Sequence, residues 1–400
     1  MEERPLIIVG SGPAGAATAL RLSQLHPELA RDILILEKAR HPRDKVCAGG
    51  LIPHSLQCLR DLGVELSVPH VVVHRAAVHT PRRDVDYQGR ELCRVIRRRE
   101  FDASLAAAVC QRGIEIRENE RVVGVAREGN AIRIETERAT YRARVLVGAD
   151  GSGSVVRRRL FGDPRGHTGR AVMCDVPLAE TTWPGFDEAR YDFGFGPVAE
   201  GIRGYTWAFP CWIDGAAHVN VGAYSVDTTG AALTSWVDRE LARLGAAGGR
   251  RLQAFPIHWY DERQPLAASG AVLVGDAAGV DPLMGEGISF ALEYGKRAGD
   301  AVAGAFASGD FSLAAYERDI RRSWLGKKLR RLNLAVRLFY GPTWPLWFAV
   351  AGRSRRAQEL GLRWYNGVDG WDQRSGWQAL RALCSGKFTA AEPSARPAAG

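Results

Sequence analysis

The sequence lacks the marks of a secreted, metal-binding or membrane-spanning protein. Its seven cysteines are an odd number without a CxxC pair, which argues against a disulfide framework, a zinc site and an iron–sulfur cluster. No basic start followed by an apolar stretch opens the chain, so no signal peptide is predicted. Residues 338–352 are uncharged, but these fifteen residues are too few to cross a bilayer. We therefore expect a globular cytoplasmic protein without a metal.

The net positive charge of the chain is concentrated in one segment. Residues 318–363 contain twelve Lys or Arg against two acids, so this segment carries a net +10 and the rest of the chain −1. The positive charge therefore indicates a local anionic partner. The same segment is rich in aromatic residues, a combination that fits an element lying in membrane headgroups. An ordinary solvated helix pair that closes the fold explains it equally well. Nucleic acid is not expected, because no recognition motif accompanies the charge.

The N-terminus carries the clearest local pattern. The apolar run LIIV at 6–9 is followed by GSGPAG at 10–15, a helix-forming stretch, and a second apolar run that ends on Glu37. In such a strand–turn–helix unit, Gly10 permits the tight turn, Gly12 lets a pyrophosphate approach, and Gly15 lets the helix pack closely. Glu37 can accept the ribose hydroxyls of an adenosine, with Lys38 beside it. The unit predicts binding of a dinucleotide.

Three further motifs resemble those of FAD proteins shaped like aromatic hydroxylases. They are RREFDASL at 98–105, GADGSGSVVR at 148–157 and GDAAGVDPLMGEGI at 275–288. The resemblance implies that Arg98 lies near FAD and that Asp276 holds a ribitol hydroxyl. It also implies that the backbone of Gly285, Gly287 and Ile288 faces the pyrimidine end of the flavin. Asp150 is a further candidate FAD contact, although Asp150 and Asp276 could instead be turn or cap residues at strand ends.

Two more motifs resemble the geranylgeranyl reductase family of FAD-dependent oxidoreductases. They are PRDKVCAGGL at 42–51 and YTWAFP at 205–210, and the similarity runs over about residues 5–345. The resemblance implies an enzyme that hydrogenates isoprenoid double bonds in a lipid or a prenyl diphosphate. It also implies an α/β fold with a Rossmann-type FAD-binding domain, an inserted antiparallel β-sheet substrate domain and a C-terminal helical region.

The expected domains follow the change of pattern along the chain. Residues 1–68, 94–170 and 262–330 are predicted to form the discontinuous FAD-binding domain, and 69–93 with 171–261 the sheet domain. Residues 331–384 are predicted to form the basic and aromatic helical region, and 385–400, rich in Ser, Ala, Pro and Gly, a disordered tail.

The same resemblance assigns the chemistry. Alkene reduction needs a hydride from reduced FAD and a proton. The candidate proton donors are Cys47, in a glycine-flanked loop beside Lys45, a water held near it, and the flavin itself; Cys47 could instead be a small buried hydrophobic residue. Tyr205, Trp207 and Phe209 share one strand face and are expected to line an apolar trough for a prenyl chain, although they could be ordinary core. The sequence has a single glycine-rich fingerprint and so predicts no second dinucleotide-binding domain. NAD(P)H or a small electron carrier is therefore expected to bind transiently and reduce the flavin.

Three alternatives share the flavin motifs. One is a flavin-dependent monooxygenase acting on a small aromatic or secondary-metabolite substrate. Another is a flavin-dependent halogenase, which needs a lysine, and Lys45 is the lysine expected near the flavin among six in the chain. The last is a flavin-binding sensor without turnover.

Overall fold

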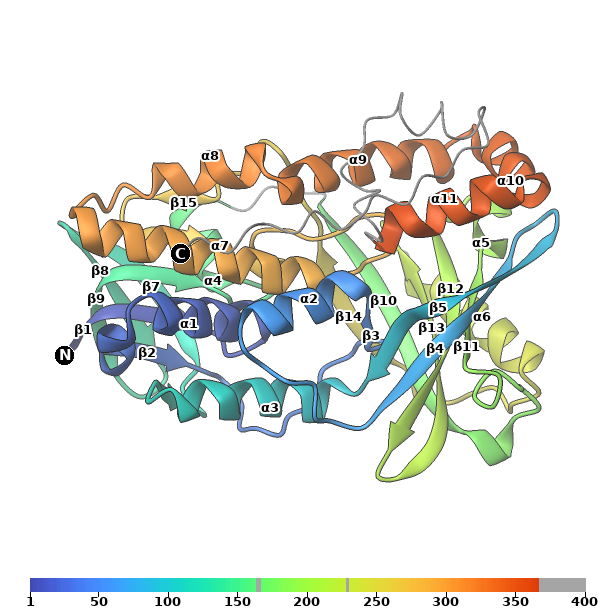
Figure 1. Cartoon of the computed structure of the whole chain (residues 1–400), viewed down its shortest axis with the longest axis horizontal. Helices are drawn as coiled ribbons and strands as arrows, with labels where there is room; N and C mark the ends of the chain where they lie inside the picture. The colour runs from blue at the N-terminus through green and yellow to red at the C-terminus, as the bar shows by residue number, and fades with distance from the viewer. Residues whose placement is uncertain (163–166, 228–229, 367–400) are drawn as a thin grey trace, which may run out of the picture.

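The computed structural model describes residues 1–162, 167–227 and 230–366. The tail expected at 385–400 and the end of the expected region 331–384 lie outside the described residues. The described chain forms two sheets side by side, and the helices of its C-terminal part run along the upper side of both (Figure 1). The expected α/β fold with a nucleotide-binding half and a sheet half is confirmed.

The first sheet is built on buried parallel strands. Its path runs β15-β16-β9-β1-β2-β6, and the β7–β8 hairpin joins at β9. The apolar runs of β1 and β2 are fully buried, as expected for a parallel sheet covered on both faces. The strands are β1 (Glu2–Val9), β2 (Ile33–Leu36), β6 (Glu115–Arg117), β7 (Val122–Glu128), β8 (Ala131–Thr136), β9 (Thr140–Gly148), β15 (Ala267–Ala268) and β16 (Ala271–Leu273).

The second sheet has the order β14-β10-β13-β12-β11-β4-β5-β3. Its neighbours are antiparallel except β4 and β11, which run parallel. The strands are β3 (Gly50–Leu51), β4 (His70–His79), β5 (Asp84–Ile96), β10 (Thr168–Pro177), β11 (Arg190–Gly194), β12 (Gly204–Ile213), β13 (Ala216–Ser225) and β14 (Gln253–His258). The sheet therefore includes β3, the end of β5 and the start of β10, which the sequence analysis grouped with the FAD-binding domain. The predicted division into domains stays a prediction.

Helices cover both sheets. In the first half α1 packs against α3 and α7, and α6 covers one face of the second sheet through its own apolar cluster. The helices are α1 (Pro13–Leu25), α2 (Pro53–Asp61), α3 (Arg98–Gln111), α4 (Val155–Leu160), α5 (Gly196–Ala199), α6 (Gly230–Arg243), α7 (Ile288–Ser308), α8 (Ala314–Arg322), α9 (Trp324–Phe339), α10 (Trp344–Arg353) and α11 (Arg355–Asn366). Short 3-10 turns are η1 (Pro27–Asp32), η2 (Leu178–Glu180) and η3 (Gly275–Ala277).

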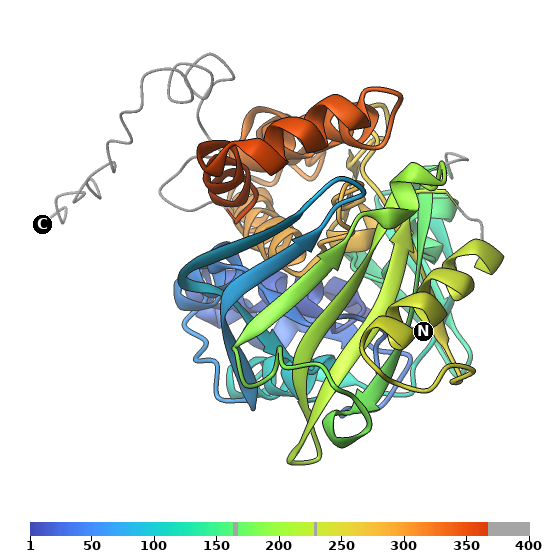
Figure 2. The same ribbon diagram turned by 90° about the vertical axis from the view of Figure 1, so that its right-hand side faces the viewer.

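The C-terminal helices close the molecule. Helices α9, α10 and α11 lie across the second sheet on the side opposite α6 (Figure 2). Within the part of the chain that the structure describes, no helix combines the length and apolarity needed to cross a bilayer. The C-terminal helices instead form a cover whose inner side chains face the sheet.

Candidate active site

A single large cavity runs between the two sheets and beneath the C-terminal helices. Its volume is about 1150 Å³, and it extends from Glu37 at the end of β2, past Cys47, to Trp347 and Val350 on α10. This is large for a ligand pocket and leaves room for both a dinucleotide and a second, apolar molecule. Every candidate site residue lines it except Gly15.

The glycine turn has the geometry expected of a pyrophosphate site. Gly10 adopts φ +100°, and a Cβ there would meet the carbonyl oxygen of Ala149 at 2.4 Å. A Cβ at Gly15 would meet the carbonyl oxygen of Gly10 at 2.0 Å, so Gly15 serves helix packing. At Gly12 a Cβ would meet only the end of Arg43, at 3.6 Å, so this position opens to the cavity. The N-terminus of α1 has no side-chain cap and is available to an anion, which fits FAD.

Glu37 is buried where the adenosine half of a dinucleotide would lie. Its carboxylate accepts hydrogen bonds from the backbone and hydroxyl of Ser11, both at 2.9 Å, and from the Ala39 amide at 3.0 Å. Burial opposes ionisation, but Arg43 and these hydrogen bonds hold the pKa of Glu37 below its usual range. Lys38, next along the chain, is exposed at the rim.

Two arginines supply positive charge to this end of the cavity. Arg98 donates to both oxygens of the buried Asp102, at 2.6 and 2.8 Å, and Arg43 lies 3.1 Å from the same carboxylate. Burial disfavours the charged form of Arg98, but Asp102 outweighs it and raises the pKa of the guanidinium. The sequence analysis quoted Arg43 within a motif and gave it no role. The structure places it between Glu37 and Asp102, within reach of Gly12.

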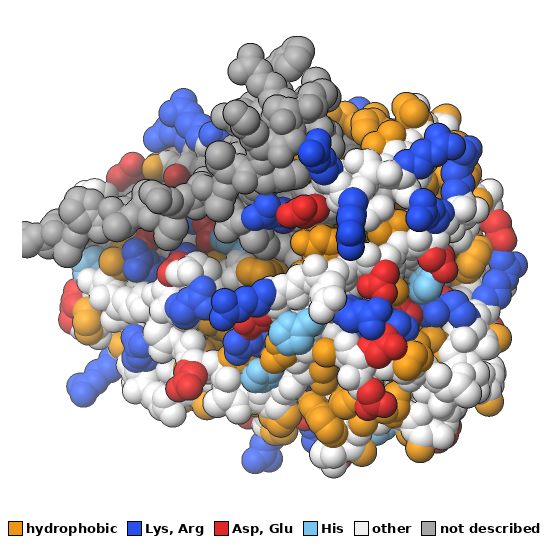
Figure 3. All heavy atoms as spheres, turned by 45° about the vertical axis from the view of Figure 1, so that its right-hand side comes forward, with side chains coloured by type: hydrophobic (Ala, Val, Ile, Leu, Met, Phe, Trp, Pro, Cys, Tyr) orange, Lys and Arg blue, Asp and Glu red, His pale blue; other side chains and the backbone are white. Residues whose placement is uncertain are grey.

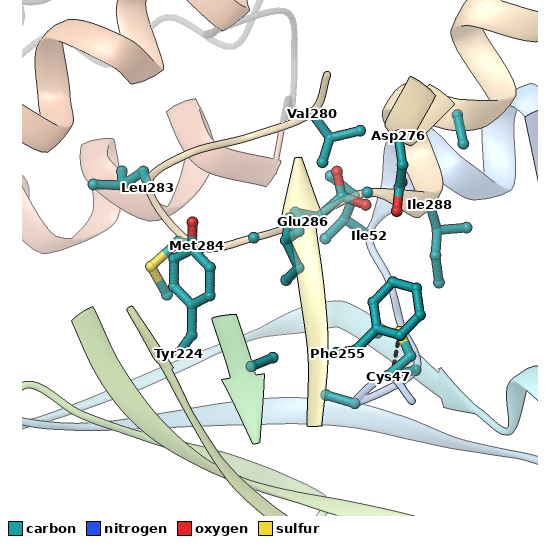
Figure 4. A pocket seen from close by; sticks show the side chains of 18 of the residues that line it. Cys47, Ile52, Tyr224, Phe255, Asp276, Val280, Leu283, Met284, Glu286 and Ile288 are labelled. Atoms are coloured by element: carbon teal, nitrogen blue, oxygen red, sulfur yellow. Dashed lines mark hydrogen bonds between the residues drawn. The ribbon is translucent and has the colours of Figure 1, made fainter. Parts of the chain in front are cut away.

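The two aspartates at strand ends differ. The Asp150 carboxylate accepts from the Ser154 hydroxyl and from the amides of Val155 and Val156, so it caps the start of α4. That is the cap role considered as its alternative, and contact of Asp150 with FAD stays a prediction. Asp276 accepts from the Ser152 hydroxyl at 3.0 Å, and its other oxygen points toward Gly287. Asp276 therefore keeps one oxygen directed along the cavity wall (Figure 4).

Cys47 and Lys45 lie in the middle of the cavity. The Cys47 sulfur accepts from the Gly49 amide at 3.4 Å, and Cys47 is half-buried below Phe255 (Figure 4). The Lys45 ammonium sits 3.2 Å from the centre of the Phe255 ring. Burial, with the charge of Arg98, lowers the pKa of Lys45 to about 8, although Asp276 and Cys47 oppose the shift. An amine with its pKa lowered to about 8 thus lies in the same loop as Cys47.

The loop at 281–284 is held by four tyrosine hydroxyls, and the sequence analysis predicted none of these contacts. Three consecutive carbonyls accept tyrosine hydroxyls: Pro282 from Tyr224 at 3.0 Å, Leu283 from Tyr340 at 2.6 Å and Met284 from Tyr205 at 2.6 Å. Tyr365 donates to the buried Asp281, whose carboxylate also accepts the amides of Leu283 and Met284. Burial raises the pKa of Asp281 to about 7. Tyr340 ends α9 and Tyr365 lies on α11, so the C-terminal helices are tied directly to this loop.

Aromatic side chains form one wall of the cavity. Tyr205, Trp207 and Phe209 all line the cavity from β12, and Phe193 of β11 joins them, 5.7 Å from Tyr205 and 5.4 Å from Phe209 between ring centres. The indole of Trp207 donates to Asn220 at 2.7 Å, so its one polar group is satisfied. The opposite wall comes from the C-terminal helices, which the sequence analysis did not assign to the site: Leu334, Leu338, Trp347 and Phe348. The outer half of the cavity is therefore mainly apolar, although Arg331, Gln358 and Asn366 also line the cavity.

Comparisons with known proteins agree with this geometry. Residues 3–196 match the model of an FAD binding domain. The chain is 28% identical over 345 residues to a digeranylgeranylglycerophospholipid reductase of Methanosarcina acetivorans, covering 80% of each chain. A geranylgeranyl bacteriochlorophyll reductase-like structure from Thermoplasma acidophilum superimposes with a TM-score of 0.74 at 21% identity, covering 96% of both chains. A flavin-dependent brominase gives 0.73 at 20% identity, covering 96% of this chain and 98% of the other.

Proposed function

We propose that the chain, which carries an FAD binding domain and is similar to a digeranylgeranylglycerophospholipid reductase, hydrogenates carbon–carbon double bonds of an isoprenoid chain. The chain would be carried by a lipid or by a prenyl diphosphate. The observation that carries the proposal is the continuity of the cavity: its dinucleotide end opens without a break into an aromatic and aliphatic trough. A polyprenyl chain binds by burial of apolar area, and such a trough supplies it.

The described residues fit FAD at one end of the cavity. Gly10 and Gly12 with the α1 N-terminus would receive the pyrophosphate, Glu37 the adenosine ribose, and Asp276 a ribitol hydroxyl. When bound, reduced FAD supplies the hydride that reduction of an alkene requires. The tyrosine-bound loop 281–284 and the following Gly285–Ile288 segment would face the flavin from one side.

The protein's own part is orientation, exclusion of water and delivery of a proton. Trp207 and Phe209 would hold the alkene against the flavin end, and the C-terminal helices would keep the site dry. We propose that the proton comes from the Cys47 thiol, because Cys47 lines the cavity between the dinucleotide end and the aromatic wall. Lys45, in the same loop and with its pKa lowered to about 8, is suited to return a proton to that sulfur.

An external donor must reduce the flavin. The described chain offers one glycine-rich dinucleotide fingerprint, at 10–15, and the cavity is shared with the apolar trough. We propose that NAD(P)H or a small reduced electron carrier acts as a transient donor.

The cover over the trough is suited to an anionic membrane surface. Leu334, Leu346 and Val350 are 56%, 62% and 43% exposed, and Leu334 and Val350 also line the cavity. Exposed arginines at 337, 353, 355 and 356 accompany them, and Figure 3 shows hydrophobic and basic side chains together along the upper edge. We propose that α9–α11 rest in headgroups and that the prenyl chain enters between them.

Vesicle co-sedimentation tests this membrane proposal. Each arginine near an anionic surface contributes about 1 kcal/mol, screened by salt. The double variant Arg337→Glu, Arg356→Glu should bind anionic vesicles much more weakly than the wild type, whereas Arg138→Glu, on the turn before β9, should not. Equal binding to neutral and anionic vesicles would refute the electrostatic part.

One observation supports a different flavoenzyme. The half-buried amine of Lys45 in the cavity is the group that a flavin-dependent halogenase needs. Product formation from an aromatic substrate that requires halide, oxygen and reduced flavin would favour that activity, and product without halide would favour a monooxygenase.

The direct test of the proposed function is lipid mass spectrometry. The chain would be expressed in cells that produce prenyl diphosphates, with Gly12→Val as a matched variant that lacks FAD. The wild type should yield prenyl lipids or diphosphates heavier in steps of two hydrogens. Identical profiles in both strains would contradict the proposal.

A further inference from the structure

A second group of reactive side chains lies between α2 and α7, outside the lining of the catalytic cavity. His54 and Cys58 are four residues apart on α2 and therefore share one face of the helix, and Glu293 meets them from α7. The two helices lie side by side (Figure 1). The Cys58 side chain is buried, and the side chains of His54 and Glu293 are 24% and 8% exposed.

The three ligand atoms form a nearly equilateral triangle. Cys58 Sγ lies 3.5 Å from His54 Nε2 and 3.6 Å from Glu293 Oε2, and the two latter atoms are 3.5 Å apart. Ligands placed tetrahedrally around Zn²⁺ at their usual bond lengths of about 2.0–2.3 Å lie about 3.3–3.6 Å from one another. The triangle is therefore already one face of a zinc tetrahedron. We propose that His54, Cys58 and Glu293 bind one zinc ion, with the fourth position open to water.

The surroundings orient the ligands for this. Arg297 donates to Glu293 Oε1 at 2.9 Å and also pairs with Asp319, which leaves Oε2 directed at His54 and Cys58. The Trp324 ring packs on the imidazole of His54, 4.2 Å between centres. Outer partners of this kind fix the direction of metal ligands. Cysteine with histidine favours zinc over the hard cations Mg²⁺ and Ca²⁺, which prefer oxygen ligands.

The charges balance when the ion is bound. The acids Asp61, Glu293 and Asp319 with the Cys58 thiolate give −4, whereas Lys296, Arg297 and Zn²⁺ give +4. Lys296 lies 3.5 Å from Glu293 Oε2 and is also bonded to Asp61, so it keeps a partner when Oε2 turns to zinc. Zinc binds cysteine as the thiolate, so binding breaks the Cys58 S–H bond, forms the Zn–S bond and releases one proton to solvent.

The ion would fix two segments that border the catalytic cavity. Helix α2 follows the Cys47 loop and β3, and α7 begins at Ile288 directly after the 281–287 loop. A zinc bridge between them is a structural clamp, and it does not depend on which reaction the enzyme performs. The proposed zinc site departs from the expectation, drawn from the sequence, of a protein without a metal. The spacing of His54 and Cys58 is visible in the sequence, but the third ligand, Glu293, lies 235 residues from Cys58.

The test uses the FAD-loaded protein and zinc alone. Equilibrium dialysis against buffered Zn²⁺, followed by metal analysis, should find one ion per chain, and the same with Mg²⁺ should find none. Cobalt in place of zinc should give the visible absorption bands of tetrahedral thiolate coordination, at longer wavelength than FAD. Cys58→Ala and Glu293→Gln should each weaken zinc binding by more than the roughly 10- to 100-fold that loss of an outer partner costs.

Two matched variants locate the ion. Cys47→Ser, in the cavity, and Cys110→Ser, an exposed thiol, should both still bind one zinc. FAD absorbance and circular dichroism show whether Cys58→Ala has folded. If it has not, zinc binding by Glu293→Gln, which keeps the thiol, tests the proposal. Zinc uptake well below one per chain in the wild type would overturn the proposal. So would uptake that both Cys58→Ala and Glu293→Gln leave unchanged.

Discussion

Lys45 allows a quantitative test of the electrostatics of the cavity. The variant Lys45→Met removes the ammonium but keeps an unbranched side chain that can still pack on Phe255. Burial lowers the pKa of Lys45 from 10.5 to about 8 in the folded, FAD-free protein. One pKa unit corresponds to about 1.4 kcal/mol, so holding the charge in the cavity costs up to about 3 kcal/mol of folding free energy.

The sign follows from where the proton is bound. Below pH 8 Lys45 is charged in both states, and the folded state bears the full cost. Between pH 8 and about 10.5 the unfolded chain holds the proton and the folded chain does not, so wild-type stability rises with pH relative to the variant. We expect Lys45→Met to be more stable than the wild type by up to about 3 kcal/mol at pH 7. This advantage should shrink as the pH approaches 10.

Urea unfolding of the FAD-free proteins, followed by tryptophan fluorescence, gives the difference in free energy of unfolding between Lys45→Met and the wild type at pH 7 and at pH 10. Lys38→Met removes an exposed lysine at the rim of the same cavity and is the matched control for loss of an ammonium group as such. A wild-type protein more stable than Lys45→Met at pH 7, or a stability difference that is equal at both pH values, would refute the reasoning.

Three other changes test separate parts of the site. Gly12→Val should fold but retain no FAD on purification, because the valine side chain enters the open face of the turn. The flavin released from the denatured wild type should be FAD, and release of FMN alone would contradict the assignment. Cys47→Ser should keep FAD and its reduction by the donor, yet lose about 100- to 10,000-fold in alkene reduction; unchanged turnover would place the acid elsewhere. Tyr340→Phe should lose about 1–3 kcal/mol by stranding the Leu283 carbonyl, whereas Tyr294→Phe, whose hydroxyl has no partner among the described residues, should be neutral.

The parts of the site that the sequence predicted are formed by residues within one strand or one strand–turn–helix–strand unit. Gly10, Gly12 and Glu37 belong to one strand–turn–helix–strand unit, and their spacing alone determines that they meet at one cavity wall. The period of two in Tyr205, Trp207 and Phe209 likewise placed them on one face of β12. Both patterns depend on backbone geometry within a few residues, which is why they can be read from the sequence.

The features that the sequence did not reveal depend on pairing between distant segments. The hydroxyls that hold residues 282–284 come from β12, β13 and the end of α9, and nothing in a single tyrosine indicates its acceptor. The parallel pairing of β4 with β11 joins strands separated by more than a hundred residues. For Asp150 the motif left two roles open: the structure shows its carboxylate capping α4, and its contact with FAD stays a prediction.

The central claim is tested most directly by the oxidative half-reaction. The flavin of the purified protein would be reduced without oxygen and mixed with geranylgeranyl diphosphate or a prenylated lipid, and the band of the oxidised flavin would be followed. The account predicts that the band returns with the alkene, with a product two hydrogens heavier for each double bond reduced. A flavin that stays reduced with every prenyl substrate, yet is reoxidised rapidly by oxygen together with an aromatic compound, would contradict it.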